Sequence, residues 1–255
     1  MKSSSELNEV PTTPVVFTCA DKDYFDLFGG AFVYSFSEMG HDVHIHIVNP
    51  DKKCYDLARK LKFACDTNVT FSHEVTDMQP YRDLESVVDS PTASYYMCSG
   101  WFKMPEFLRT AGQMMLLDID SLARKPFDFP KEDLGFYPRF YEEKQIKKVF
   151  GTIFYVTKKR IKLIEKLKNC ILSYPLQWYT EQFALYETLK DETEYFKFDD
   201  NFVDGDARED GSDFKDNSPI WTGKGRIKWK HPQYLELFEY WKNKFQENFP
   251  EGEKK

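Results

Sequence analysis

The first third of the chain alternates strand-like and helix-like segments, and this alternation restricts the fold more than any other feature of the sequence. The segments cover residues 15–20, 25–39, 43–48, 51–63 and 69–75 in turn. A β-α-β-α-β order predicts a mainly parallel sheet flanked by helices, because parallel neighbours need a long crossover between them. We therefore predict an α/β, Rossmann-like fold.

One of these strand-like segments has two histidines at alternate positions. Val43-His44-Ile45-His46-Ile47 alternates apolar and polar residues. Such alternation predicts a strand with one less buried face. We interpret His44 and His46 as surface or packing residues of that strand rather than as metal ligands.

The remainder of the chain contains further periodic segments and one acidic stretch. We expect strands at residues 114–117, 135–139 and 149–156, and helices at 80–88, 95–110, 159–172, 178–189 and 233–249. Residues 199–216 contain eight aspartates or glutamates without periodicity, which predicts a mobile loop. With no repeat and no evident linker, we expect one domain over residues 15–249, a flexible amino terminus over 1–14 and a charged tail over 250–255.

Two carboxylates follow directly on an apolar run in the middle of the chain. Residues 114–117 read Met-Met-Leu-Leu, and Asp118-Ile119-Asp120 comes next. A short apolar run of this kind predicts a strand with both faces covered, and ligands of open α/β sheets bind at the carboxyl ends of such strands. Alternate side chains of an extended segment point the same way. Asp118 and Asp120 are therefore candidate ligands of a divalent cation that could neutralise a diphosphate.

Two further segments have compositions that suit a nucleotide. At the end of the first strand, the Asp21 carboxylate can accept a hydrogen bond from a base or ribose, and the Tyr24 ring can stack on a base. Asp21 or Asp23 can equally be the N-cap of the helix that follows, and both interpretations remain open. Near the carboxyl end, residues 221–228 contain two glycines and three cations, which suit a diphosphate or, alternatively, form a solvated basic turn.

Composition limits the partners and the compartment. The net charge of −7 argues against general affinity for nucleic acid. The five cysteines are odd in number and have no Cys-x-x-Cys spacing, which is typical of reduced thiols in a cytoplasmic protein. The amino terminus lacks the apolar run of a signal peptide, and no stretch approaches the roughly 20 apolar residues of a membrane span. We expect a cytoplasmic protein that can act peripherally at a membrane surface.

Taken in order, these segments resemble a GT-A glycosyltransferase, most closely the glycosyltransferase family 8 and glycogenin-type group, over roughly residues 15–228. The resemblance implies a GT-A-like fold and assigns roles to individual residues. Asp118 and Asp120 would bind Mn²⁺ or Mg²⁺ together with the donor diphosphate, and Glu181 and Gln182, which open a helix, would be catalytic candidates on the acceptor side. The nucleotide sugar would contact Ala20, Asp21, Tyr24, Lys103, Gly223, Lys224, Gly225 and Arg226.

The chain departs from the family pattern at one metal ligand. The family carries a His-x-Gly-x-x-Lys segment whose histidine is the third ligand, and no histidine occupies that place near Gly223 and Gly225. Water and phosphate oxygens could complete the shell, or His231 or Asp204 could substitute. The third ligand is therefore open at this stage.

The resemblance implies a metal-dependent transfer of a sugar from a nucleotide-diphosphate donor, which it predicts to be a UDP-sugar, to a glycan, a lipid-linked saccharide or another hydroxyl acceptor. Two other functions are compatible with the residues. A haloacid-dehalogenase-type phosphatase would use Asp118 as its nucleophile, although Leu122 stands where that class has Thr or Val, and residues 1–117 would become an extra domain. A non-catalytic module that binds a nucleotide sugar or a glycan is the other alternative.

Overall fold

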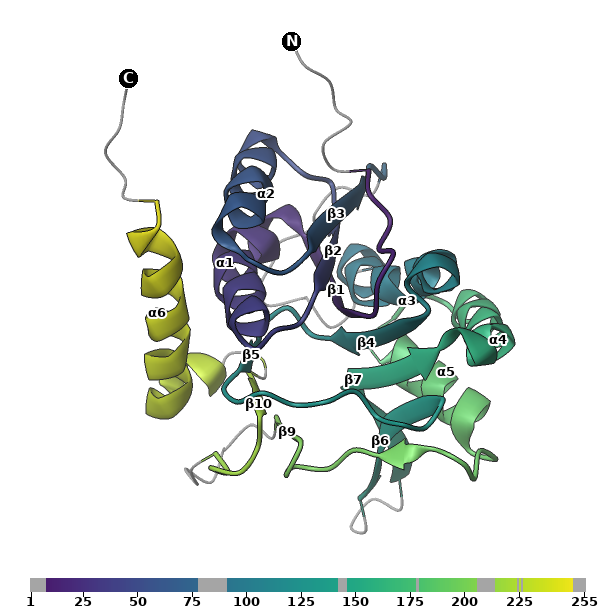
Figure 1. The fold of residues 1–255 in the computed structure, drawn as a ribbon. Helices are drawn as coiled ribbons and strands as arrows, with labels where there is room; N and C mark the ends of the chain where they lie inside the picture. Colours follow the sequence, from purple (N-terminus) through teal and green to yellow (C-terminus); the bar gives the residue numbers. More distant parts are fainter. Residues whose placement is uncertain are drawn as a thin grey trace.

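A seven-stranded sheet forms the centre of the molecule (Figure 1). The structure is a computed structural model that describes residues 8–77, 91–141, 146–177, 179–205, 214–223, 225 and 227–249. Four of the six neighbouring strand pairs are parallel, and β7 runs antiparallel to both β4 and β6. In spatial order the strands are β3 (Val69–Glu74), β2 (Val43–Val48), β1 (Val15–Asp21), β4 (Gln113–Leu117), β7 (Ile146–Thr157), β6 (Leu134–Tyr141) and β8 (Phe196–Lys197).

Helices cover both faces of this sheet (Figure 1). One face carries α1 (Lys22–Glu38) and α2 (Lys52–Ala64), and α6 (Pro232–Glu247) packs on the outside of α1. The other face carries α3 (Pro91–Ala111), α4 (Ile161–Leu172) and α5 (Thr180–Leu189). The predicted α/β fold, a mainly parallel sheet flanked by helices, is therefore confirmed.

Strand β4 is buried on both faces, as its apolar run predicts. Met115 and Leu117 join the core formed with α1, α2 and α6, whereas Met114 and Leu116 join the core formed with α3, α4 and α5. β4 lies parallel to β1, in a register that pairs Phe17 with Leu116. The carboxyl ends of β1 and β4 therefore lie side by side, and both lead into predicted site residues.

A second, three-stranded sheet brings the carboxyl-terminal part of the chain to this edge. β5 (Ser121–Ala123) begins directly after Asp120, and its antiparallel partner β10 (Ile220–Thr222) pairs Thr222 with Ser121. β9 (Val203–Asp204) pairs with the other side of β10. β9 lies within the acidic stretch 199–216, so the expectation of a loop without regular structure is wrong for these two residues.

The expectation of a less buried face for β2 is also wrong. All six residues of β2 are buried, including His44 and His46. His44 forms hydrogen bonds through both ring nitrogens, to Thr70 Oγ1 and Ser72 Oγ, each at 2.9 Å. Burial lowers the pKa of His44 to about 3, so the ring is neutral. The two histidines are packing residues, as predicted, but they pack inside the protein.

Several expectations fall on residues outside the described part of the chain. These are the helix at 80–88, the first half of the flexible terminus at 1–14 and the charged tail at 250–255. Among the described helices, none combines the length and the apolarity that crossing a membrane requires.

Candidate functional site

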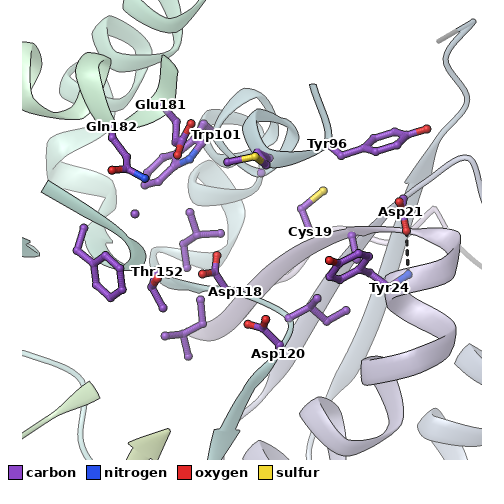
Figure 2. Close-up of a pocket in the computed structure, with 18 of the residues that line it drawn as sticks. Cys19, Asp21, Tyr24, Tyr96, Trp101, Asp118, Asp120, Thr152, Glu181 and Gln182 are labelled. Atoms are coloured by element: carbon purple, nitrogen blue, oxygen red, sulfur yellow. Dashed lines mark hydrogen bonds between the residues drawn. The ribbon is translucent and has the colours of Figure 1, made fainter. Parts of the chain in front are cut away.

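A cavity of about 380 Å³ opens where β1 and β4 end and α5 begins (Figure 2). This volume lies in the range of small-molecule sites. Asp118 and Asp120 lie between two groups of side chains, with Asp21 and Tyr24 to one side and Glu181 and Gln182 on the opposite wall. The lining residues are Cys19, Ala20, Asp21, Tyr24, Tyr96, Met97, Gly100, Trp101, Leu116, Leu117, Asp118, Ile119, Asp120, Phe150, Gly151, Thr152, Tyr179, Glu181 and Gln182.

The two aspartates reach the cavity from a turn rather than from an extended strand. The Ser121 amide donates to the Asp118 carbonyl at 3.0 Å, and the Asp118 amide donates to the Thr152 carbonyl of β7 at 3.3 Å. Both carboxylates line the same cavity, as predicted, but a turn and not an extended segment brings them there. The turn is anchored to the main sheet on one side and to β5 on the other.

Asp118 is a carboxylate whose ionised form is disfavoured by its surroundings. Its side chain is open to the cavity but lies deep among protein atoms, and this burial raises its pKa above the usual value, with the nearby Asp120 charge raising it further. A hydrogen bond with Thr152 and the charge of Lys228 oppose the rise. An added cation would offset the repulsion between the two carboxylates, so this donor set fits a divalent metal.

Three side chains from the carboxyl-terminal part of the chain hold Asp120. Its Oδ2 pairs with the ammonium of Lys228, its Oδ1 accepts from Thr222 Oγ1 at 3.4 Å, and its carbonyl accepts from the Tyr234 hydroxyl at 2.7 Å. The predicted diphosphate contacts in the basic segment 221–228 are Lys224 and Arg226 and do not include Lys228. The spacing Gly-x-x-Lys from Gly225 to Lys228 could have identified it.

Asp21 is the N-cap of α1. Its Oδ1 accepts from the amides of Asp23 at 3.0 Å and Tyr24 at 2.8 Å. Asp21 and Tyr24 also line the cavity, next to the buried Ala20. The capping interpretation is therefore correct, and a nucleotide contact by the same residues stays a prediction.

Glu181 and Gln182 enter the cavity from the first turn of α5. The residue that precedes α5, Tyr179, has a left-handed backbone with φ of 72°. This conformation is uncommon for a bulky side chain and recurs at functional sites. Among the described residues, Glu181 Oε2 and Gln182 Oε1 are buried without a hydrogen-bond partner. Burial raises the pKa of Glu181. Unpartnered buried acceptors of this kind suit the hydroxyl groups of a ligand.

Lys103 lies elsewhere. Its ammonium is 3.2 Å from Glu74 Oε2, and Lys103 is not among the residues that line the cavity. Gly223 lies beside the aspartate turn, with its amide 3.3 Å from the Asp120 carbonyl. Gly225 has a left-handed backbone with φ of 52°, and Lys224 and Arg226 lie outside the described residues.

The described part of the chain brings no third His, Cys, Asp or Glu side chain to the two aspartates. Within the described ranges, no three His, Cys, Asp or Glu side chains are grouped so that they could hold a metal. Neither His231 nor Asp204, the two substitutes considered from the sequence, completes such a group. A metal at Asp118 and Asp120 could complete its shell with oxygen ligands from solvent or from a bound phosphate.

The order of strands and the placement of helices are those of the GT-A fold of glycosyltransferases. The fold is similar to a crystal structure of the galactosyltransferase LgtC in complex with donor and acceptor sugar analogs, with a TM-score of 0.58 and 14% identity over 91% of this chain and 100% of that one. It is also similar to the apo structure of the bifunctional glycosyltransferase WbbM, with a TM-score of 0.56 and 10% identity over 91% of this chain and 52% of that one. No protein-family model matches the sequence, and no curated protein matches it significantly.

Proposed function

We propose that this chain is a glycosyltransferase that moves a sugar from a nucleotide-diphosphate donor to the hydroxyl group of an acceptor. The main support is the composition of one cavity: Asp118 and Asp120 follow the carboxyl end of β4, which runs parallel to β1, and face Glu181 and Gln182 across the cavity. Ligands of open α/β sheets bind at this edge. A nucleotide sugar has a diphosphate for the aspartate side and hydroxyl groups for the unpartnered oxygens of α5.

We also propose the finer assignment that the sequence resemblance implies. The chain would act like the glycosyltransferase family 8 and glycogenin-type group, with a UDP-sugar as donor and a glycan or lipid-linked saccharide as acceptor. The negative net charge makes nucleic acid an unlikely partner. A cytoplasmic location is supported by the five cysteines, all of which are described and free of disulfides.

The side chains divide the chemistry between them. Asp21 and Tyr24 would orient the nucleotide, and Asp118 and Asp120 would hold Mn²⁺ or Mg²⁺. When bound, the metal would neutralise charge that grows on the departing diphosphate. Lys228 adds a fixed positive charge on the same side. On the opposite wall, Gln182 Oε1 would orient sugar hydroxyls, and Glu181 is the candidate group to accept the proton of the acceptor hydroxyl as its oxygen bonds to the sugar.

The phosphatase alternative has little support in the structure. Residues 15–117 supply β1, β2, β3 and β4 of one sheet, so they are not the separate domain that this alternative requires. Asp199 and Asp200, which could imitate a downstream acidic motif, do not line the cavity. Asp200 instead accepts from the Tyr137 hydroxyl at 2.5 Å.

The test is a donor screen followed by a product assay. Binding of nucleotide diphosphates and nucleotide sugars is measured by thermal shift with and without Mn²⁺, since a ligand of the native state raises its stability. Release of nucleotide diphosphate from the best donor is then measured. We expect Asp118→Asn to reduce kcat/KM by at least about 100-fold, and Asp128→Asn, at an exposed site after the same turn, to leave it unchanged.

Each alternative has its own outcome in this assay. Phosphate release from a simple phosphomonoester with Mg²⁺, lost in Asp118→Asn, would support the phosphatase instead. Donor binding without any product would support the binding module. No binding of any nucleotide would contradict the proposed function.

A further inference from the structure

The aspartate pair already has a cation supplied by the chain. Lys228 lies in the short helix η5 (Ile227–Lys230), and only 4% of its side chain is exposed. Its ammonium pairs with Asp120 Oδ2 and lies 4.7 Å from the ring centre of Phe28 and 5.7 Å from that of Tyr24. Aromatic faces attract a desolvated ammonium. The Asp120 carboxylate and two aromatic rings therefore hold the Lys228 ammonium in place.

The stem of Lys228 fills the space beside Gly223. A Cβ atom at position 223 would lie 2.6 Å from Lys228 Cδ and 2.8 Å from Tyr234 Cζ, which is closer than real contacts allow. With Lys228 in this position, residue 223 cannot supply a metal ligand. The described residues provide no third ligand from elsewhere. Where the family pattern has a side chain that ligates a metal ion, this chain instead has the Lys228 ammonium, which is itself a cation paired with Asp120.

A divalent metal and the Lys228 ammonium would compete for the same carboxylate. Lys228 already pairs with Asp120 Oδ2, and a metal held by Asp118 and Asp120 would bring a second cation close to it, which costs energy in a site with little water. A bound diphosphate changes this balance, because its oxygens can accept hydrogen bonds from the ammonium and can also ligate the metal. Lys228 can then leave Asp120 without being left buried and unpaired, which would be costly.

We propose that Lys228 is the resident cation of the aspartate pair, and that a divalent metal binds there only when a nucleotide diphosphate replaces Asp120 as the partner of the Lys228 ammonium. The inference rests on the proposed function, because it requires a diphosphate ligand. When only a fraction of the molecules is in the state that can bind a ligand, the measured affinity for that ligand is reduced by this fraction. If Lys228 leaves Asp120 in about 1 of 100 molecules, metal affinity without nucleotide falls about 100-fold.

The test measures Mn²⁺ binding directly, by electron paramagnetic resonance of free Mn²⁺, and requires no activity. Lys228→Met and Lys228→Gln remove the charge but keep a long side chain, and the glutamine amide can still donate to Asp120. Lys230→Met, at an exposed position of the same short helix, removes the same charge outside the cavity. Without nucleotide, we expect both Lys228 variants to bind Mn²⁺ at least tenfold more tightly than the wild type and Lys230→Met.

The result that overturns the inference is Mn²⁺ binding of equal affinity in the wild type and the Lys228 variants. Tight Mn²⁺ binding by the wild type without nucleotide would also overturn it, whether or not the variants fold. In the wild type, UDP should allow Mn²⁺ to bind, whereas UMP, which lacks the second phosphate, should not. If no nucleotide binds at all, the proposed function fails, while a gain of Mn²⁺ binding in the Lys228 variants still supports Lys228 as the resident cation.

Discussion

Glu181 carries an acceptor oxygen that nothing in the described protein satisfies. Its Oε2 is buried in the cavity wall, and burial raises the pKa of its carboxyl group above the ordinary value. A raised pKa in the folded state means that the ionised form destabilises the fold, so the cost is present at high pH and is absent below the ordinary pKa. Glu181 is thus a residue at which ligand binding and stability have opposite requirements.

We predict that Glu181→Gln stabilises the protein at pH 8 by about 1 kcal/mol and strongly reduces sugar transfer. The stabilisation should shrink towards pH 4.5, where the wild-type carboxyl group is protonated. Urea unfolding at the two pH values measures it. Glu187→Gln is the matched control on the same helix, because Glu187 is half exposed and pairs with the exposed Lys190. Equal stabilisation at both pH values would rule out an ionisation cost at Glu181.

At the scale of single elements, the start of α1 serves the fold and the proposed nucleotide site with one residue. Asp21 caps the helix through two backbone amides and also lines the cavity. We predict that Asp21→Ala costs about 1 kcal/mol of stability, whereas Asp21→Asn keeps the cap and the stability. If the carboxylate also contacts the nucleotide, both variants should lose nucleotide affinity.

Unfolding and nucleotide titration of the two variants separate the roles of Asp21. Asp51 provides the control, because it caps α2 through the Cys54 amide at 3.1 Å and does not line the cavity. Asp51→Ala should lower stability by a similar amount and leave nucleotide affinity unchanged. Full nucleotide affinity in Asp21→Asn would reduce Asp21 to a capping residue.

The elements that could be predicted from sequence are those whose signals are local. The apolar run before Asp118 predicts β4 and the position of the carboxylates, and the alternation of the first third predicts β1 to β3. His44 and His46 look like a polar strand face, because the sequence does not reveal that hydroxyl groups of β3 bond to their rings and that Phe107 of α3 packs against them. The resemblance predicts that Lys103 contacts the nucleotide sugar, whereas in the structure Lys103 pairs with Glu74 of β3 and does not line the cavity. The pairing of Lys228 with Asp120 likewise joins residues that only the tertiary fold brings together.

At the scale of the whole molecule, a partly buried polar cluster joins β2, β3 and α3 and makes stability depend on pH. Burial by itself would raise the pKa of Glu74, but nearby groups lower it well below the ordinary 4.5. Its oxygens accept from the Tyr95 hydroxyl at 2.6 Å and lie 3.2 Å from the Lys103 ammonium. His46, at 3.7 Å, is too distant for a hydrogen bond. The depressed pKa contributes stability above pH 4.5, and this contribution is lost as the pH falls below that value.

We predict that Glu74→Gln lowers the free energy of unfolding by about 2 kcal/mol at pH 7 and by progressively less below pH 4.5. Urea unfolding across this pH range measures the difference. Glu165→Gln is the control, because Glu165 pairs with Arg109 and both side chains are about half exposed. It should change stability by less than about 1 kcal/mol at any pH. A constant difference for Glu74→Gln over the whole range would contradict the assignment.

The bonds from Thr222, Lys228 and Tyr234 to the aspartate turn also set an order of events during synthesis. A growing chain contains β1, β4 and both aspartates long before the ribosome has added these three residues. Until then Asp120 lacks its fixed geometry and its resident charge. A nascent chain would therefore fold much of its main sheet while remaining unable to capture a donor, and the ability to bind would arise only after segment 222–234 has docked.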